Sequence, residues 1–188
     1  MATETELKLR VASHDPVRER LMALGARSLG RVVETNVILD GREGPLRSRG
    51  CGLRVRSTVD DGGASAGATL TYKGPRAAGV LKVREELEVS VTNADTTLQI
   101  LAKLGFAPIL QYEKRRESWQ LGSCRVELDE PPHLGLFVEI EGPDEAAILS
   151  CRNDLGLGAA EAVAQSYVAM LVAYCDERGI MSRTIGLG

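Results

Sequence analysis

Acidic and basic side chains recur in pairs, two residues apart, along this chain of 188 residues. The acidic pairs are Glu4/Glu6, Glu86/Glu88 and Glu139/Glu141, and the basic pairs are Arg54/Arg56 and Lys114/Arg116. In an extended strand, residues two apart point to the same face at a separation of about 7 Å, so like charges repel each other there. A ligand of opposite charge would offset that repulsion. The pairs therefore indicate sites for charged ligands.

The two kinds of pair suit two different ligands. Carboxylates without neighbouring histidines are hard oxygen ligands, which suit Mg²⁺ or Mn²⁺. The chain has only two histidines, His14 and His133, which argues against a histidine-rich zinc site. Paired arginine and lysine side chains donate hydrogen bonds and positive charge to phosphate oxygens. A site with both kinds of pair suits a complex of a divalent metal with a polyphosphate.

A simpler interpretation holds for any single strand. A charged face can be the solvated outer face of an antiparallel sheet, with the apolar face turned to helices. Solvated faces favour threonine, serine and mixed polar residues, whereas here acids and bases are sorted into repeated pairs. We therefore favour charged faces that meet in one site.

The composition bounds the class of protein. Hydrophobic residues make up 44% and charged residues 26%, which is typical of a globular domain with its own core. The net charge of −3 gives no basic field for a nucleic acid. No apolar run reaches the ~20 residues that span a bilayer, and the N-terminus has no apolar signal core. We expect a cytoplasmic protein without nucleic-acid or membrane partners, and four scattered cysteines fit a reducing compartment.

Alternating apolar and polar residues predict the strands that carry the pairs. They fall at residues 3–11, 31–39, 52–57, 68–73, 81–90, 110–121, 123–129 and 137–141. An antiparallel sheet of these strands could close into a barrel with its charged faces in the lumen. The apolar faces would then point outward, where helices could cover them. This inverts the usual barrel, whose interior is apolar.

A strand–helix unit occurs twice in the sequence. Gly25 lies nineteen residues after Glu6, and Gly105 lies nineteen residues after Glu86. Each glycine follows an apolar helical pattern, so we expect both helices to end there with a left-handed residue. The repetition indicates an internal duplication.

The C-terminal part of the chain predicts one more helix. Apolar residues at helical spacing favour a helix over residues 159–177. No stretch of the sequence has the composition of a domain linker. We therefore expect a single domain over residues 1–178 and a flexible tail over residues 179–188.

Seven motifs follow one another along the chain. They are Glu4-Thr-Glu6-Leu-Lys8, Leu53-Arg54-Val-Arg56, Thr71-Tyr-Lys73-Gly-Pro, Arg84-Glu-Glu86-Leu-Glu88, Lys114-Arg-Arg116, Val126-Glu-Leu-Asp129 and Leu134-Gly-Leu-Phe-Val-Glu139-Ile-Glu141-Gly. This ordered series resembles the CYTH superfamily, which includes class IV adenylyl cyclases, thiamine triphosphatases and inorganic triphosphatases. Ser166-Tyr167 is similar to the class IV adenylyl cyclase branch. The run Val37-Ile-Leu39-Asp40 departs from many relatives, which carry an aromatic residue before this aspartate.

The resemblance implies an α+β fold, an eight-stranded antiparallel β-barrel called a triphosphate tunnel, with helices covering the outside. It implies a triphosphate substrate bound with Mg²⁺ or Mn²⁺. The implied metal ligands are Glu4, Glu6, Asp129, Glu139 and Glu141. The implied phosphate contacts are Lys8, Arg54, Arg56, Lys73, Arg84, Lys114 and Arg116.

Two reactions fit the same grip on the phosphates. Attack of water on the terminal phosphorus would make the chain a triphosphatase on inorganic tripolyphosphate or thiamine triphosphate. Attack of the ribose 3′ hydroxyl on the innermost phosphorus of ATP would make it a cyclase that releases cyclic AMP and pyrophosphate. A polyphosphate-binding module without turnover is a third alternative, although the full set of acids counts against it. The residues do not distinguish these alternatives, Mg²⁺ from Mn²⁺, or a monomer from a homodimer.

Several other residues have structural interpretations. Asp15 is expected to cap the first helix, and Trp119 to pack at a strand end. Tyr167 fits the apolar stripe of the last helix, so we favour a core position over a nucleoside contact. The two histidines lie beside turn residues and are expected at the surface.

Overall fold

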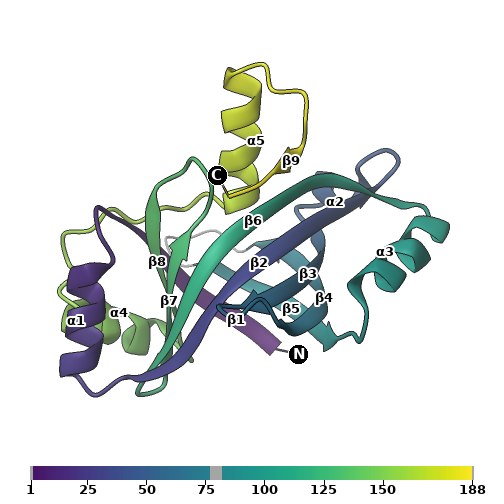
Figure 1. The fold of residues 1–188 in the computed structure, drawn as a ribbon. Helices are drawn as coiled ribbons and strands as arrows, with labels where there is room; N and C mark the ends of the chain where they lie inside the picture. Colours follow the sequence, from purple (N-terminus) through teal and green to yellow (C-terminus); the bar gives the residue numbers. More distant parts are fainter. Residues whose placement is uncertain (1, 77–81, 188) are drawn as a thin grey trace.

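The computed structural model describes residues 2–76 and 82–187, and its centre is one sheet closed into a barrel (Figure 1). The strands are β1 (Ala2–Val11), β2 (Arg27–Gly41), β3 (Gly52–Asp60), β4 (Ser65–Arg76), β5 (Lys82–Ser90), β6 (Phe106–Leu121), β7 (Cys124–Glu130), β8 (Leu136–Glu141) and β9 (Thr184–Ile185). The helices are α1 (Asp15–Ala23), α2 (Pro45–Ser48), α3 (Ala94–Lys103), α4 (Glu145–Asp154) and α5 (Tyr167–Glu177).

The barrel closes because the two ends of the strand order pair with each other. Neighbouring strands are antiparallel in the order β2-β3-β4-β5-β1-β8-β7-β6, and β2 pairs again with β6. With 15 and 16 residues, β2 and β6 run side by side across the whole barrel in Figure 1. Their register shifts between Ser28 and Gly30, and a local shift of this kind increases strand twist. The predicted eight-stranded antiparallel barrel is confirmed, and β9 is added to it beside β6.

Most apolar side chains of the strands point outward, as the alternation predicts, whereas Phe137 lies opposite Asp129 on the face of the charged residues. Helices α1 and α4 cover β1, β7 and β8, where Leu21 and Ile148 pack with Leu9 and Val126 and all four are fully buried. Helix α3 covers β2 and β3, with Leu101 in the same cluster as Val55. Burial of these side chains outside the barrel leaves the lumen to the charged residues.

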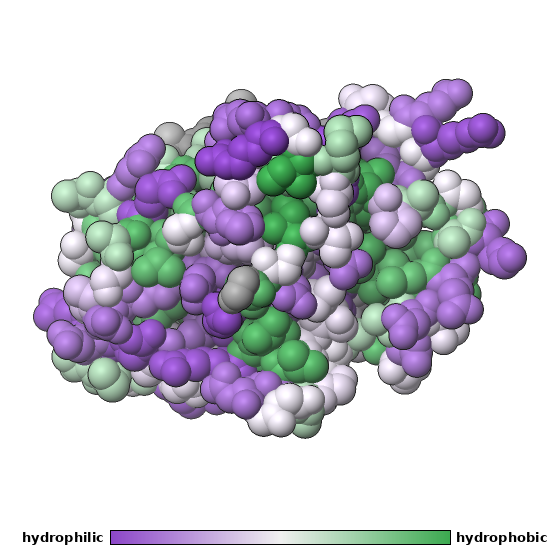
Figure 2. Space-filling model, turned by 45° about the horizontal axis from the view of Figure 1, so that its top comes forward, coloured by the Kyte–Doolittle hydropathy of each residue, from purple (hydrophilic) through white to green (hydrophobic). Residues whose placement is uncertain are grey.

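The helical cover over the barrel is incomplete. Leu87 and Val89 on β5 are 53% and 56% exposed, and Leu104 after α3 is 68% exposed. In Figure 2, groups of hydrophobic side chains lie between hydrophilic ones on the face that is shown. The outward faces of the strands therefore stay apolar even where no helix covers them.

The ends of the first helices follow the predicted turn chemistry in part. Gly25 and Gly105 follow α1 and α3 with φ angles of 71° and 90°, which confirms the left-handed residues. The prediction that Asp15 caps α1 is wrong, because His14 takes the N-cap position without a side-chain hydrogen bond. Asp15 lies inside the first turn and pairs with Arg18 at 2.6 Å.

Helix α5 is shorter than the predicted helix over residues 159–177, and the prediction is wrong for residues 159–166. The Oγ of Ser166 accepts a hydrogen bond from the N–H of Ala169 at 3.2 Å, so this serine is the N-cap. The helix therefore begins at Tyr167, and the segment before it is not helical.

That preceding segment pairs with the edge of β1. The N–H of Val163 donates to the carbonyl of Lys8 at 2.8 Å, and the N–H of Arg10 donates to the carbonyl of Glu161 at 2.9 Å. Among the residues that the structure describes, β5 pairs with β1 as far as Glu6, and the later backbone groups of β1 use other partners. Satisfying that edge outweighs the helical preference of the segment.

The C-terminal residues also contact the barrel. Ile185 in β9 is buried, and the N–H of Leu187 donates to Oε2 of Glu113 at 2.9 Å. The division into a domain over residues 1–178 and a flexible tail over residues 179–188 stays a prediction. In the part of the chain that is described, none of the helices has the length and apolar character to cross a membrane.

Candidate functional site

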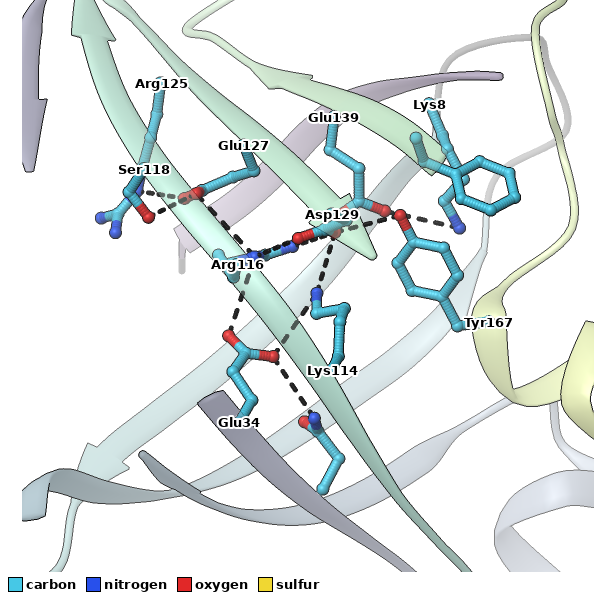
Figure 3. Close-up of polar contacts among 12 residues, drawn as sticks. Lys8, Glu34, Lys114, Arg116, Ser118, Arg125, Glu127, Asp129, Glu139 and Tyr167 are labelled. Atoms are coloured by element: carbon cyan, nitrogen blue, oxygen red, sulfur yellow. Dashed lines mark hydrogen bonds and ion pairs between the residues drawn. The ribbon is translucent and has the colours of Figure 1, made fainter. Parts of the chain in front are cut away.

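The register of the strands brings the charged side chains together inside the barrel. Residues directly opposite each other on paired strands share a face of the sheet. Lys8 lies opposite Glu139 in the β1–β8 pair, and Arg116 lies opposite Asp129 in the β6–β7 pair. Figure 3 shows these side chains pointing toward one another across the lumen. The sorting of acids and bases in the sequence is therefore a sorting of one interior surface.

Asp129 is the centre of the basic part of the lumen. Its Oδ2 accepts hydrogen bonds from Lys114 Nζ at 2.9 Å, Arg116 Nη2 at 2.6 Å and the hydroxyl of Tyr167 at 3.0 Å. Its Oδ1 accepts from Arg116 Nε at 2.7 Å. The side chain is fully buried. Burial disfavours the charged form of Arg116, but Asp129 and Glu34 outweigh it and raise the pKa of the guanidinium.

Glu34, on β2, is a second buried carboxylate that the sequence interpretation missed. It is 2% exposed, and its oxygens lie 3.2 Å from Arg56 Nη1 and 3.4 Å from Lys114 Nζ. Burial alone would raise the pKa of Glu34, but the charges of Lys114, Arg116 and Arg56 lower it far below its ordinary value. Glu34 has no acidic neighbour two residues away, so the search for pairs passed over it. The sequence feature that could have identified Glu34 is an acidic residue on a predicted strand, placed where that strand would pair with the strand of Lys114.

Lys8 is almost completely buried next to the last helix. Its Nζ lies 3.6 Å from the ring centroid of Tyr167 and 3.4 Å from Oε1 of Glu139. It also donates to the carbonyl of Gln165 at 3.1 Å. The cation therefore sits over an aromatic face, an arrangement that attracts a positive charge to the negative face of the ring.

Tyr167 lies in the core of the protein and also in the site. The ring packs in an apolar cluster and meets Phe137 edge-on at a centroid distance of 5.3 Å, which confirms the predicted core position. The hydroxyl donates to Asp129, which the prediction did not include. Burial and the charge of Asp129 raise the pKa of Tyr167, so its hydroxyl stays protonated and remains a donor.

Another part of the lumen is acidic. Glu4, Glu6 and Glu141 lie on the neighbouring strands β1 and β8, with Glu6 directly opposite Glu141. Burial and the charges of Glu4 and Glu6 raise the pKa of Glu141. Burial and a hydrogen bond with Glu86 raise the pKa of Glu4, against the lowering effect of Lys73. Like charges are therefore crowded here beyond what the nearby cation offsets.

Lys73 joins the acids of this part of the lumen. Its Nζ lies 2.9 Å from Glu4 and 2.6 Å from Glu86. Arg84 lies apart from both groups, because its guanidinium donates to the carbonyl of Gly74 at 2.9 and 3.2 Å. Lys73 and Arg84 are therefore the two predicted phosphate contacts that lie outside the basic part of the lumen.

Arg54 has a free donor in the lumen. Its Nη2 donates to Oγ1 of Thr71 at 3.3 Å and lies 3.8 and 3.6 Å from Glu86 and Glu88. Its Nε is buried and has no hydrogen-bond partner among the described residues. Burial and the charge of Arg56 lower the pKa of Arg54. An additional anion would satisfy the buried N–H and offset both effects.

Glu127 and Arg125 form a smaller cluster beside the central one. Glu127 accepts hydrogen bonds from Ser118 and Arg125 and lies 3.8 Å from Arg116 Nε. Figure 3 shows this cluster on the far side of Arg116 from Tyr167. Glu127 therefore helps to hold Arg116 in place rather than adding to the acidic pairs.

The acidic part of the lumen has the chemistry of a divalent cation site. No three acidic, histidine or cysteine side chains within residues 2–76 and 82–187 are already arranged to hold a metal ion. Lys73 instead binds Glu4, and Arg116 binds Glu139 at 2.7 Å. The donors are all carboxylates, which suit Mg²⁺ or Mn²⁺, and burial together with the charges of Glu4 and Glu6 raises the pKa of Glu141. The residues present therefore fit such an ion.

A closed antiparallel barrel with an ionised lumen and helices around it defines the structural class of this protein. The sequence matches the CYTH domain family over residues 2–167. It is 30% identical over 138 residues, 73% of this chain and 75% of the relative, to a Methanocaldococcus jannaschii protein named a putative adenylate cyclase. The chain therefore belongs to the CYTH domain family.

Solved structures share the fold. A protein from Pyrococcus horikoshii has a TM-score of 0.78 and 26% identity, covering 91% of this chain and 99% of that one. A Hippeastrum protein described as a putative adenylyl cyclase with a dominant triphosphatase activity has a TM-score of 0.71 and 18% identity, covering 91% of this chain and 96% of that one. At 18% identity, the second likeness concerns the fold.

Proposed function

We propose that this chain is a divalent-metal-dependent triphosphatase, which hydrolyses the terminal phosphate of a triphosphate inside the barrel. The observation that carries the proposal is the convergence of basic side chains from β1, β3 and β6 on one buried space. These side chains are Lys8, Arg54, Arg56, Lys114 and Arg116. A triphosphate carries about four negative charges, and phosphoryl transfer depends mainly on positioning and neutralising them.

The basic side chains would bind and orient the phosphates. Arg54 would use its unpaired Nε as a donor to a phosphate oxygen. Lys114 and Arg116 already share Asp129, so their charges are held in place before the ligand arrives. Groups fixed in advance lose little freedom when they bind, which favours both affinity and rate.

The acids would hold the cation next to the phosphates. Glu4, Glu6, Glu139 and Glu141 are the proposed ligands, and Asp129 would join them only if Lys114 and Arg116 turned from it to the substrate. A bound Mg²⁺ or Mn²⁺ supplies positive charge that offsets the charge of the phosphates during transfer. It would also offset the burial and the neighbouring negative charges that raise the pKa of Glu141.

Hydrolysis is favoured over cyclisation because Tyr167 and Phe137, the aromatic rings beside Asp129, are already engaged. Tyr167 is covered by Lys8 and bound to Asp129, and Phe137 is fully buried against it. Neither ring offers a free face for an adenine base, whereas tripolyphosphate needs none. Adenylyl cyclase activity is the second candidate, and the name of the M. jannaschii relative favours it.

Phosphorus NMR of the products tests the proposal. The protein is incubated separately with tripolyphosphate, thiamine triphosphate and ATP, each with Mg²⁺, with Mn²⁺ and with EDTA. Orthophosphate released only with metal is the expected result. Cyclic AMP with pyrophosphate would replace the proposal by the cyclase, and binding of tripolyphosphate without any product would replace it by a binding module.

A further inference from the structure

Glu34 is an anion built into the part of the lumen that is proposed to bind phosphates. Its Oε1 lies 3.2 Å from Arg56 Nη1 and 3.7 Å from Arg116 Nε, and its Oε2 lies 3.4 Å from Lys114 Nζ. Oε2 also accepts a hydrogen bond from Asn36 at 3.3 Å. The carboxylate thus contacts three cations that are predicted to bind phosphate. Its oxygens occupy positions near these cations that phosphate oxygens could also take.

These three cations do not depend on Glu34 for their positions. Lys114 donates to Asp129, and Arg116 donates to both Asp129 and Glu139. The Nε of Arg56 donates to Oδ1 of Asn36 at 3.2 Å. Each cation therefore keeps a second partner that would hold it if the charge of Glu34 were removed.

We propose that Glu34 is a specificity-determining residue, a resident anion that offsets the basic lumen in the free protein and repels an incoming phosphate. The inference rests on the proposed function, since it concerns the same lumen. In the free protein, Glu34 balances charges that would otherwise repel each other. When a polyphosphate enters, the same carboxylate faces its oxygens from close range and weakens binding. A ligand must therefore carry several negative charges, spread over several cations, to bind in spite of it.

The electrostatic argument favours a gain of affinity when the charge is removed. Charge interactions over a few ångströms are strong at a buried site, because little water screens them. Each negative charge of the ligand is repelled by the Glu34 carboxylate, so removing that carboxylate's charge removes several repulsive interactions. Against this gain stands only the loss of the Glu34 contacts, and the second partners limit that loss. Glu34→Gln keeps the shape of the side chain and an oxygen that can accept from Asn36.

A matched control exists on the outside of the barrel. Glu117 on β6 is a buried carboxylate that pairs with Arg18 at 2.9 Å and Arg31 at 3.1 Å and accepts from Trp119. Trp119 belongs to the outer core between the barrel and helices α1 and α4. Glu117→Gln therefore removes a buried charge from an ion cluster without changing the lumen.

The test is isothermal titration calorimetry of the wild-type protein, Glu34→Gln and Glu117→Gln with tripolyphosphate in EDTA, at two salt concentrations. We expect Glu34→Gln to bind at least tenfold more tightly than wild type, with a steeper loss of affinity at high salt, while Glu117→Gln stays within twofold. Equal or weaker binding by Glu34→Gln, with wild type binding, would overturn this inference and leave the proposed function standing. No binding by any of the three proteins in EDTA would overturn this inference, whereas the proposed function falls only if tripolyphosphate also gives no product with Mg²⁺ or Mn²⁺.

A second measurement covers the case in which Glu34→Gln does not fold alone. The ligand would then supply the missing anion, so adding tripolyphosphate is expected to restore a cooperative thermal transition to Glu34→Gln. The increase in Tm should exceed that of wild type and of Glu117→Gln. Failure of tripolyphosphate to restore or stabilise the fold of Glu34→Gln would overturn the inference.

Discussion

The hydroxyl of Tyr167 lies 3.0 Å from Oδ2 of Asp129, and it ties the first residue of the last helix to the centre of the barrel. Helix α5 packs against the barrel beside β6 and β9 (Figure 1). Among the residues labelled in Figure 3, Tyr167 comes from this helix, and its hydroxyl contacts Asp129. The contact holds Asp129, and through it Lys114 and Arg116. The helix thus supports the site as well as the core.

Tyr167→Phe removes one donor from Asp129 and keeps the ring under Lys8. We expect it to lower the free energy of unfolding by about 1 to 2 kcal/mol, because a buried hydrogen bond to a charged group is lost. Urea unfolding measures this value, and kcat/KM should fall in parallel. Tyr174→Phe is the control, because the Tyr174 ring stacks on the exposed His133. Equal losses in both variants would contradict a role for the hydroxyl.

Arg54→Gln is expected to damage binding more than stability. The Arg54 ion pairs are long, at 3.6 and 3.8 Å, so the fold gains little from them. Loss of a charged donor to a phosphate should cost about 1.5 to 3 kcal/mol of binding, or roughly 10- to 100-fold in KM. Steady-state kinetics and thermal melting separate the two effects. A large fall in Tm with unchanged KM would show that Arg54 is structural.

Glu141→Gln is expected to stabilise the metal-free protein at neutral pH. The pKa of Glu141 is raised in the fold, so its ionised form opposes folding at pH above its ordinary value of 4.5. Removing that charge should raise Tm in EDTA and abolish the further rise in Tm that Mg²⁺ produces in wild type. Differential scanning calorimetry with and without Mg²⁺ measures both. A lower Tm in EDTA would contradict the crowding of charges.

The contribution of Glu34 to stability should depend on pH in the opposite sense. Its pKa is lowered in the fold, so its stabilising effect is present above the ordinary value of 4.5 and is lost as the pH falls below it. Wild type should therefore be more stable than Glu34→Gln at pH 7, and the difference should shrink between pH 4.5 and lower values. Urea unfolding at a series of pH values gives this difference. A constant difference would mean that Glu34 does not act through its charge.

Ser166→Ala tests the start of helix α5. The serine satisfies the N–H of Ala169, and loss of an N-cap costs about 1 kcal/mol. Because Tyr167 follows directly, we also expect a lower kcat/KM than for wild type. Ser166→Asp, which restores a cap, should recover both the stability and the activity. Recovery of stability alone would separate the cap from the site.

The sequence was informative where one rule governs a whole element. Strict alternation predicted the strands, and the ordered motifs predicted the barrel and its family. Glu34 escaped prediction because its importance arises from pairing with Lys114 on a strand 80 positions further along, which no local pattern encodes. The helix over residues 159–166 was wrongly predicted because the free edge of β1 recruits Val163 and Glu161. Tyr167 gained its second role only when the fold placed Asp129 beside it.

The pairing of Glu161 and Val163 with β1 has a consequence for how the molecule assembles. On one edge of β1, the backbone groups of Lys8 and Arg10 bond with residues more than 150 positions later. Contacts this distant in sequence slow folding, because a long segment must be ordered before they form. During synthesis, β1 must therefore wait with an unpaired edge until most of the chain has left the ribosome. We therefore expect the pairing of residues 161–163 with β1, which can follow only after these residues leave the ribosome, to be a late step in the folding of the barrel.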